Sequence, residues 1–354
     1  MNLLSELTNQ YMRVALIETA KHAGKHAAFD YLISAAEAGG VILGVTASGV
    51  GGIRLDSQDT AGRPRLWLPK ETIVSVPVQL YDEADAGLEI LRMTNYPTAL
   101  GHILICRVVE PGHVTVAGPI AATYQKSMCE EMAELGAGLT LIDSAMSGRG
   151  TVPPDTADAA ILSTGAVVSR NMEMVVEETA HTVMLYSLPQ IADEDAAGII
   201  RRYSGKGKIL VLRKYRGVSE GAGPSYDVQE LDLKTSIGGT KYMDRVLDQQ
   251  VCYIYFPGAF TAGVVRDISR YNLSQITFVV DDPTDIAMDS ASWAGLSKRG
   301  MKVEVLKDIK VAAITVNPFA PGGYSFDPRA FREEMRKSIP GIPVIDVREE
   351  ARRG

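Results

Sequence analysis

The sequence predicts an α/β protein in two domains with largely parallel sheets. Short apolar, strand-like runs alternate with helical patterns from one end of the chain to the other. The 354 residues exceed what one hydrophobic core usually supports, and 46% of them are hydrophobic, enough to pack two cores. We therefore expect a first domain over residues 1–190, a connector over 191–207 and a second α/β domain over 208–354.

In the first half, short apolar runs predict strands at 14–17, 41–45, 103–107, 114–117, 139–143, 160–163 and 182–186. Apolar residues at helical spacing predict helices at 25–38, 84–94, 120–135 and 170–178. The stretch 48–69 is rich in Gly, Arg, Asp and Pro, which is typical of a long loop or a small antiparallel insertion.

In the second half, the same criteria predict strands at 209–214, 252–256, 276–280, 302–306, 312–316 and 344–346. Helices are expected at 262–270, 290–298 and 328–337. The last helix has a well-marked start, because Asp327 can cap it and Pro328 occupies its first turn.

The amino-acid composition and net charge of the chain argue against some classes of binding partner. A net charge of −7 and a pI near 5.4 argue against binding to nucleic acid or to an anionic membrane, since both require basic surfaces. The three cysteines are far apart and form no CxxC pair, so we interpret them as core thiols of a reducing compartment. Residues 1–10 lack the layout of a signal peptide, and no apolar run reaches the ~18 residues of a membrane span. We expect a cytoplasmic protein.

The strand predicted at 14–17 leads into an altered phosphate loop, Thr19-Ala-Lys-His-Ala-Gly24-Lys25-His26, which precedes a helix. The intact motif, Gly-x4-Gly-Lys-Ser/Thr, wraps phosphates with backbone N–H groups and ligates magnesium with its last hydroxyl. Here Thr19 replaces the first glycine and His26 replaces the hydroxyl residue. The first domain is thus predicted to be P-loop NTPase-like with a degenerate loop, and the second to be Rossmann-like.

The loop residues Thr19, Ala23, Gly24, Lys25 and His26 are the candidate nucleotide-binding residues. Lys25 can direct its ammonium at a phosphate on the helix N-terminus; the alternative is a surface lysine at a helix start. Thr19 cannot take positive φ without strain, so its loop follows another path or is partly closed. His26 offers no hydroxyl to magnesium, and with His22 it forms a helical i, i+4 pair for which no third metal ligand is evident. We expect ATP or another nucleotide as ligand, and no metal site.

Asp143 ends the apolar run Leu139-Thr-Leu-Ile-Asp143, the form of the second nucleotide motif, whose carboxylate holds the magnesium shell. A glycine-rich and proline-rich loop follows it, and Arg149 in this loop is a candidate for pairing with a phosphate or a carboxylate. The alternative for Arg149 is a solvated turn.

Two further strand-to-helix turns contain small or apolar residues. The turn Ser163-Thr-Gly-Ala-Val-Val-Ser-Arg170 fits either an anion site or a helix capped by Ser169. The loop Phe256-Pro-Gly-Ala-Phe-Thr-Ala-Gly263 fits an anion site or, as we expect, a protein contact anchored by Phe256 and Phe260. We identify no Ser/His/Asp or Cys/His constellation, and therefore no catalytic residues.

Several segments resemble the smaller subunit of the lysine 5,6-aminomutase reactivase. They are Asp143-Ser-Ala-Met-Ser, Asp158-Ala-Ala-Ile-Leu-Ser-Thr-Gly-Ala-Val-Val-Ser, Ala117-Gly-Pro, Glu177-Glu-Thr-Ala-His-Thr-Val, Tyr255-Phe-Pro-Gly-Ala-Phe-Thr, Ile314-Thr-Val-Asn-Pro and Gly323-Tyr-Ser-Phe-Asp. The resemblance spans nearly the whole chain. It implies a mismatch-repair-like ATPase subunit as partner and, as client, an aminomutase that uses adenosylcobalamin and pyridoxal phosphate. The family pattern has an intact phosphate loop, from which this chain departs at Thr19 and His26.

Three functions therefore remain open. The first is an accessory protein that helps to reactivate an aminomutase of the lysine or ornithine type, acting with an ATPase partner. The second is an ATP-dependent ligase or kinase on a phosphate-loop scaffold like that of dethiobiotin synthetase. The third is an interaction subunit with a vestigial nucleotide site. The degenerate loop predicts weak ATP hydrolysis by the chain alone.

Overall fold

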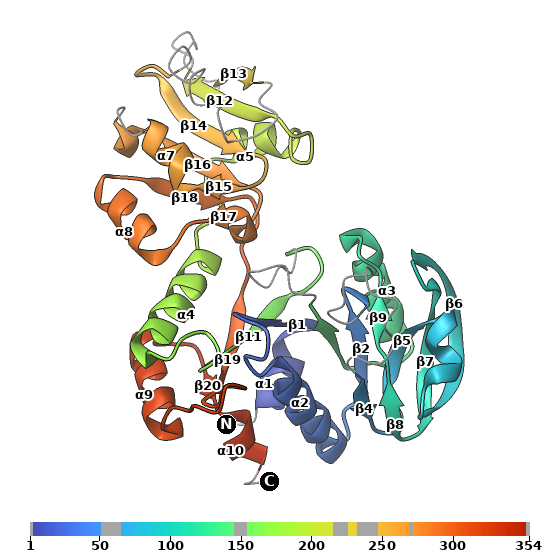
Figure 1. Cartoon of the computed structure of the whole chain (residues 1–354). Coiled ribbons are helices and arrows are strands. Elements are labelled where there is room, and N and C mark those ends of the chain that lie inside the picture. The colour runs from blue at the N-terminus through green and yellow to red at the C-terminus, as the bar shows by residue number, and fades with distance from the viewer. Residues whose placement is uncertain are drawn as a thin grey trace. The chain divides into compact units, whose positions relative to one another are not determined.

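The computed structural model of the chain describes residues 3–50, 65–144, 154–214, 226–231, 247–268 and 272–351. The chain divides into two compact units (Figure 1). Unit 1 comprises Met1–Thr179 together with Lys310–Gly354, and unit 2 comprises Ala180–Ile309. Each unit is built around its own sheet.

Unit 1 contains a large sheet whose strands come from both ends of the chain. They are β1 (Arg13–Glu18), β2 (Leu43–Ala47), β5 (Ile73–Pro77), β6 (Gly87–Thr98), β7 (Gly101–Glu110), β10 (Leu139–Asp143), β11 (Ala159–Gly165), β19 (Val311–Asn317) and β20 (Val344–Ile345). Their order is β20-β19-β11-β1-β10-β2-β5-β7-β6. Neighbours from β20 to β5 are parallel, and β7 pairs antiparallel with both β5 and β6. Strand β1 thus lies in the middle of a parallel array.

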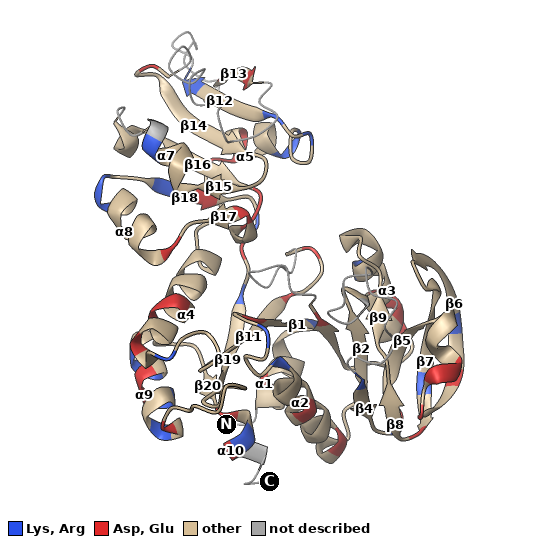
Figure 2. Ribbon diagram, viewed as in Figure 1, with Lys and Arg blue, Asp and Glu red and all other residues tan. Residues whose placement is uncertain are grey.

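Two faces of this sheet are covered by different helices (Figure 1). The helices of unit 1 are α1 (Leu3–Gln10), α2 (Lys25–Gly39), α3 (Ala122–Glu134), α9 (Pro328–Ser338) and α10 (Val347–Ala351), and α4 (Met172–Tyr186) begins there. One apolar cluster joins α1 and α2 to Val74 and Leu104, whereas another joins α3 to Ile73 and Ile103. Because successive strand residues point to opposite faces, α2 and α3 pack on opposite sides. Figure 2 shows that β2, β5 and β11 carry no charged residues, as expected of strands buried on both faces.

The described part of unit 1 also contains four short strands and a 3-10 helix. Strand β3 (Gly49–Val50) pairs with β9 (Ala117–Gly118), and β4 (Leu66–Leu68) pairs with β8 (Gly112–Val114), both antiparallel. The 3-10 helix η2 (Val78–Glu83) follows β5.

Unit 2 contains a mixed five-stranded sheet. Its strands are β12 (Ile209–Lys214), β13 (Tyr226–Leu231), β14 (Val251–Phe256), β16 (Thr277–Val280) and β18 (Lys302–Val305), in the order β13-β12-β14-β16-β18. The last three are parallel, and β12 is antiparallel to both of its neighbours. The other elements among the described residues of unit 2 are α5 (Glu194–Arg201), α7 (Ala262–Ile268), α8 (Ser290–Lys298), β15 (Phe260–Thr261), β17 (Ile286–Ala287), η3 (Leu273–Gln275) and η4 (Pro283–Asp285).

The α/β class is confirmed, together with most of the predicted elements. Helix α2 begins at Lys25, β10 spans Leu139–Asp143 and α8 spans Ser290–Lys298, all as the local patterns predict. The side chain of Asp327 caps α9 by accepting a hydrogen bond from the backbone N–H of Ala330. The strand predicted at 114–117 is instead two short strands, β8 and β9. Most of the loop predicted at 48–69 lies outside the described residues.

Two predicted elements are wrong in type. The helix expected at 84–94 is largely strand β6, whose pairing with β7 contains three register shifts that break the two-residue apolar alternation. The strand expected at 182–186 is the end of α4. Its β-branched and aromatic residues favour a strand locally, but the helix that starts at Met172 continues through them.

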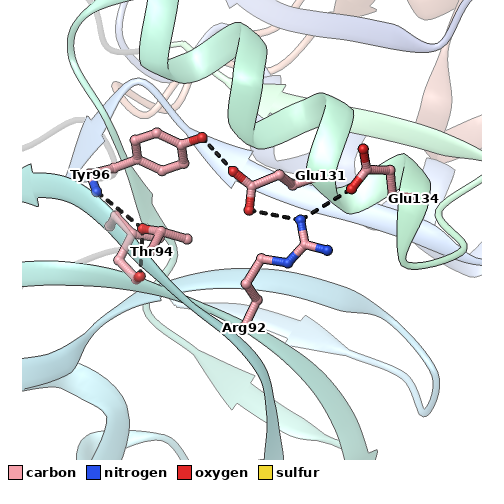
Figure 3. A network of polar contacts seen from close by, with 6 residues as sticks. Arg92, Thr94, Tyr96, Glu131 and Glu134 are labelled. Carbon is pink, nitrogen blue, oxygen red and sulfur yellow. Dashed lines mark hydrogen bonds and ion pairs between the residues drawn. The ribbon is translucent and has the colours of Figure 1, made fainter.

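Figure 3 shows the polar network that attaches β6 to α3. Arg92 donates to Glu131 and Glu134 of α3 at 3.1 Å each. The Tyr96 hydroxyl donates to Glu131, and partial burial followed by this hydrogen bond raises the pKa of Tyr96 to about 12. Arg92 and Tyr96 thus connect the edge strand β6 to helix α3.

The predicted domain boundaries also need correction. The sequence places residues 208–354 in one domain, but β19 pairs with β11, and β20 pairs with β19, in the sheet of unit 1. Unit 2 is therefore an insertion that begins within α4 and ends before β19. Local patterns do not report this arrangement, because strand pairing depends on which sheet edge is available and not on sequence order.

Candidate functional site

The turn between β1 and α2 is the centre of the candidate site. Gly24 precedes the helix with φ 112°, a left-handed conformation that glycine adopts without strain. His22 also has positive φ, at 69°, which is uncommon for a residue with a side chain. Thr19 does not adopt it; its backbone N–H donates to the Ser163 carbonyl at 2.9 Å and ties the turn to β11. The loop therefore follows a path different from that of a glycine-initiated phosphate loop.

Lys25 begins α2 and is 3% exposed, so it is not the surface lysine of the alternative interpretation. Its Nζ lies 2.7 Å from Oδ1 of Asp143, donates to the Ser144 carbonyl at 2.8 Å and lies 3.8 Å from Oε1 of Glu18. Both carboxylates are also buried, at 6% and 7% exposure. Strands β1 and β10 are parallel neighbours, which brings the ends that carry Glu18 and Asp143 to one edge of the sheet.

Glu18 and Asp143 both lie beside the single ammonium group of Lys25. Burial raises the pKa of Glu18 above 4.5, the charge of Asp143 adds to that rise, and Lys25 and His26 oppose it. The cluster of Glu18, Lys25 and Asp143, hereafter the lysine cluster, carries one net negative charge when all three groups are ionised. A proton on Glu18 makes it neutral, which favours the approach of an anion.

Asn317, at the end of β19, fastens the turn from the other side. Its Nδ2 donates to the His22 carbonyl at 3.4 Å, and its Oδ1 accepts from the backbone N–H of Phe319 at 3.3 Å. A Cβ added at Gly24 would lie 3.0 Å from the Cβ of Asn317, so glycine is required for close approach as well as for its φ. Asn317 thus connects the turn after β1 with the loop after β19.

A pocket of about 420 Å³ opens on this arrangement. Two segments at the carboxyl ends of β1 and β19 supply most of its wall, and α10 supplies one residue. The lining residues are Glu18, His22, Gly24, Lys25, His26, Ala27, Asn317, Phe319, Ala320, Pro321 and Arg348. It combines the lysine cluster and two exposed histidines with an aromatic ring and a guanidinium group, so it can accept a ligand with both an anionic and an apolar part.

The structure brings together Gly24, Lys25, His26 and Asp143 of the predicted site residues. Ala23 is buried behind the turn, where its backbone N–H donates to the Ala20 carbonyl at 3.0 Å. Thr19 contacts β11 through its backbone and through its hydroxyl, which donates to Thr164 at 3.2 Å. Arg149 lies outside the described residues.

Sequence reasoning missed several lining residues, among them Glu18, Asn317, Phe319 and Arg348. Asn317 and Phe319 follow a predicted strand, which is where ligands of parallel sheets bind, but that strand was assigned to the second domain. Glu18 directly precedes the loop and could have been noticed as a strand-end acid. No local signal identifies Arg348.

The other two turns that the sequence offered as candidate sites, at 256–263 and 163–170, have structural contacts. Phe256 and Phe260 are 2% and 0% exposed, and both rings pack with Phe278, so they form core and not an exposed protein contact. The prediction of an aromatic docking loop there is wrong, since an apolar loop looks the same in sequence whether it faces solvent or a core. In the turn 163–170, Ser169 Oγ accepts from the Asn171 backbone N–H ahead of α4, and it is Asn171 Oδ1 that accepts from a backbone N–H in the first turn of the helix, that of Glu173 at 2.9 Å.

Among the described residues, no group of three or more His, Cys, Asp or Glu side chains is arranged to hold a metal ion. No helix in the described part of the chain has the length and apolar character needed to cross a membrane. Burial raises the pKa of both the Cys106 and Cys129 thiols to about 12, as expected of core thiols.

No protein-family model matches this chain, and no curated protein matches it significantly.

Proposed function

We propose that the protein is a nucleotide-binding accessory protein of the aminomutase-reactivase type. In this proposal the pocket beside the lysine cluster binds the phosphates of ATP or a related nucleotide, and the chain acts on an aminomutase together with an ATPase partner. The client and the partner rest on the resemblance of sequence segments alone.

One observation carries the nucleotide part of the proposal. Lys25 follows a strand-turn segment, starts a helix of 15 residues and is held beside the acid that ends the neighbouring parallel strand. The helix N-terminus offers unpaired N–H groups and a partial positive charge to an anion. A phosphate that enters the pocket can take the Lys25 ammonium from Asp143, which stays beside it as the second acid of a phosphate-loop scaffold.

The missing hydroxyl at His26 supports a binding role over rapid hydrolysis. Phosphoryl transfer in such scaffolds depends on a magnesium ion held by the hydroxyl that follows the lysine. The strand order, with β1 between β10 and β11, equally supports an ATP-dependent ligase or kinase, so turnover has to be measured directly.

Calorimetric titration with ATP, ADP and GTP, with and without magnesium, tests nucleotide binding. Lys25→Met should weaken binding about tenfold or more, since a hydrogen bond to a charged group contributes about 1.5–3 kcal/mol. Lys21→Met is the matched control, because Lys21 is exposed on the same turn and does not line the pocket. Absence of binding by the wild-type chain, or an equal loss in both variants, would contradict the proposal. Sustained magnesium-dependent turnover would favour the ligase or kinase.

The accessory role is tested separately. The chain is mixed with a purified aminomutase inactivated by turnover, the ATPase subunit, ATP and fresh adenosylcobalamin, and recovery of mutase activity is followed. Recovery that requires this chain and falls with Lys25→Met supports the role. Recovery without the chain would refute it while leaving nucleotide binding intact.

A further inference from the structure

The end of the pocket opposite the lysine cluster has its own chemistry. Phe319 is 44% exposed although its ring is large and apolar, and it lines the pocket together with Ala320 and Pro321. The guanidinium carbon of Arg348 lies 5.2 Å from the centroid of the Phe319 ring. Aromatic rings and planar guanidinium groups both stack on flat groups, so each of the two side chains is suited to contact a planar ligand.

The loop that carries Phe319 is held by hydrogen bonds on both sides. Phe319 pairs with Ser325 in an isolated antiparallel bridge, and the Ala320 backbone N–H donates to the Tyr324 carbonyl at 3.0 Å. The Tyr324 hydroxyl in turn donates to the Ala166 carbonyl at 2.5 Å. Phe319 is therefore presented by an ordered hairpin, and binding against its ring needs little further ordering of the loop.

Arg348 is positioned in a similar way. It lies in α10, and the buried Asp346 accepts hydrogen bonds from the backbone N–H groups of Arg348 and Glu349 at 3.0 and 3.2 Å. Asn317, with its amide bonded to His22 and Phe319, sets the spacing between the aromatic end and the phosphate-loop end of the pocket.

We propose that Phe319 and Arg348 form a stacking subsite for the planar ring of the ligand, so that the site takes nucleoside phosphates in preference to ring-less polyphosphates. This rests on the proposed nucleotide site, and it adds the substrate class. The anionic part lies at Lys25 and the helix start, and the ring lies on Phe319, within one pocket of about 420 Å³. Stacking on an aromatic side chain tolerates different bases, because each base has a π face.

The test compares ATP with inorganic tripolyphosphate by calorimetry on the full-length chain. Stacking of one base is expected to make ATP bind about tenfold more tightly than tripolyphosphate. Phe319→Ala should remove most of this preference and leave tripolyphosphate affinity nearly unchanged, whereas Phe319→Tyr should keep it. Far-ultraviolet circular dichroism and the unfolding midpoint verify that each variant is folded.

A Phe319→Trp variant supplies a direct readout. ATP should quench its added indole fluorescence, whereas tripolyphosphate should not. Tight tripolyphosphate binding with no added affinity for ATP would overturn the stacking subsite and leave an anion site at Lys25. Equal weakening of both ligands by Phe319→Ala would also overturn it, because that pattern indicates a loop defect. If neither ligand binds, both this subsite and the nucleotide site are refuted.

Discussion

The β1–α2 turn of unit 1 and the β14–α7 turn of unit 2 are alike locally and differ in what they bury. Each joins a parallel strand to a helix through a glycine with left-handed φ, 112° at Gly24 and 116° at Gly258. After Gly24 comes Lys25, whose ammonium is buried between carboxylates. Shortly after Gly258 comes Phe260, whose ring is buried against two others. The strand-glycine-helix pattern therefore predicts the backbone conformation of a turn. Whether the turn forms a polar site or part of the hydrophobic core depends on the buried residue that follows the glycine.

The largest effect is expected in unit 2. Phe260→Ala should lower the free energy of unfolding by about 3–5 kcal/mol, because a fully buried ring is removed and a cavity remains. Urea unfolding followed by circular dichroism measures it. Phe319→Ala is the control, since that ring is partly exposed, and it should change stability by less than about 1 kcal/mol. A small loss of unfolding free energy for Phe260→Ala would contradict the core assignment and support the interpretation of this loop as a protein contact.

The corresponding substitution in unit 1 breaks an ion pair. Lys25→Met leaves Asp143 and Glu18 buried without their cation, and we expect a loss of about 3 kcal/mol at pH 7.5. The double variant Lys25→Met with Asp143→Leu should recover much of that loss, because one uncompensated charge is then absent. The double-mutant cycle is completed by measuring denaturant unfolding of the wild type, the two single variants and the double variant. Additive losses would show that the pair is not coupled.

The two glycines should differ in their response to alanine. Both substitutions place a side chain at left-handed φ, which costs about 1–2 kcal/mol. At Gly24 the added Cβ also meets Asn317 at 3.0 Å, whereas no heavy atom lies within 4 Å of one added at Gly258. Gly24→Ala should therefore lose more stability than Gly258→Ala in thermal unfolding, and it should weaken nucleotide binding as well. Equal losses of stability in the two variants would show that the close approach of Asn317 to Gly24 does not restrict the residue at position 24.

The smallest effect concerns pH, where the two units respond in opposite directions. In unit 2, burial and then the neighbouring Asp282 raise the pKa of Asp285 to about 6. A raised pKa stabilises the fold at low pH, and this contribution is lost as pH rises through about 6. In unit 1, burial of Asp158 is outweighed by the hydrogen bonds from Arg13, which hold its pKa below 3.8. Its contribution is present above that pH and is lost as pH falls further.

Asp285→Asn should therefore flatten the decline in stability between pH 4 and pH 7, by on the order of 1 kcal/mol, since partial exposure screens the group. Asp158→Asn should destabilise the chain at pH 7, and this effect should shrink as pH falls below 3.8. Urea midpoints across this range measure both variants. The same slope in wild type and Asp285→Asn would show that another group carries the titration.

Restoring a standard phosphate loop requires a different residue from the one that motif comparison selects. Thr19 departs from the motif, but it does not adopt left-handed φ and bonds to β11, whereas His22 does adopt it. Glycine at position 22 relieves the strain, while glycine at position 19 removes a hydroxyl contact. Alignment to a motif identifies the departure, and only backbone geometry shows where the loop needs a glycine.

The sequence alone determined what depends on neighbouring residues: the α/β class, the start of α2 at Lys25, the extent of β10 and the cap at Asp327. These follow from hydrophobic period, glycine and capping chemistry, which act within a few residues. Only the tertiary structure shows that β19, which follows the inserted unit 2, pairs with β11, which precedes it. This pairing places Asn317, Phe319 and Arg348 beside the β1–α2 turn, some 300 residues away in the sequence. The tertiary structure also decided that Phe260 is core, because burial belongs to the packed chain and not to the segment.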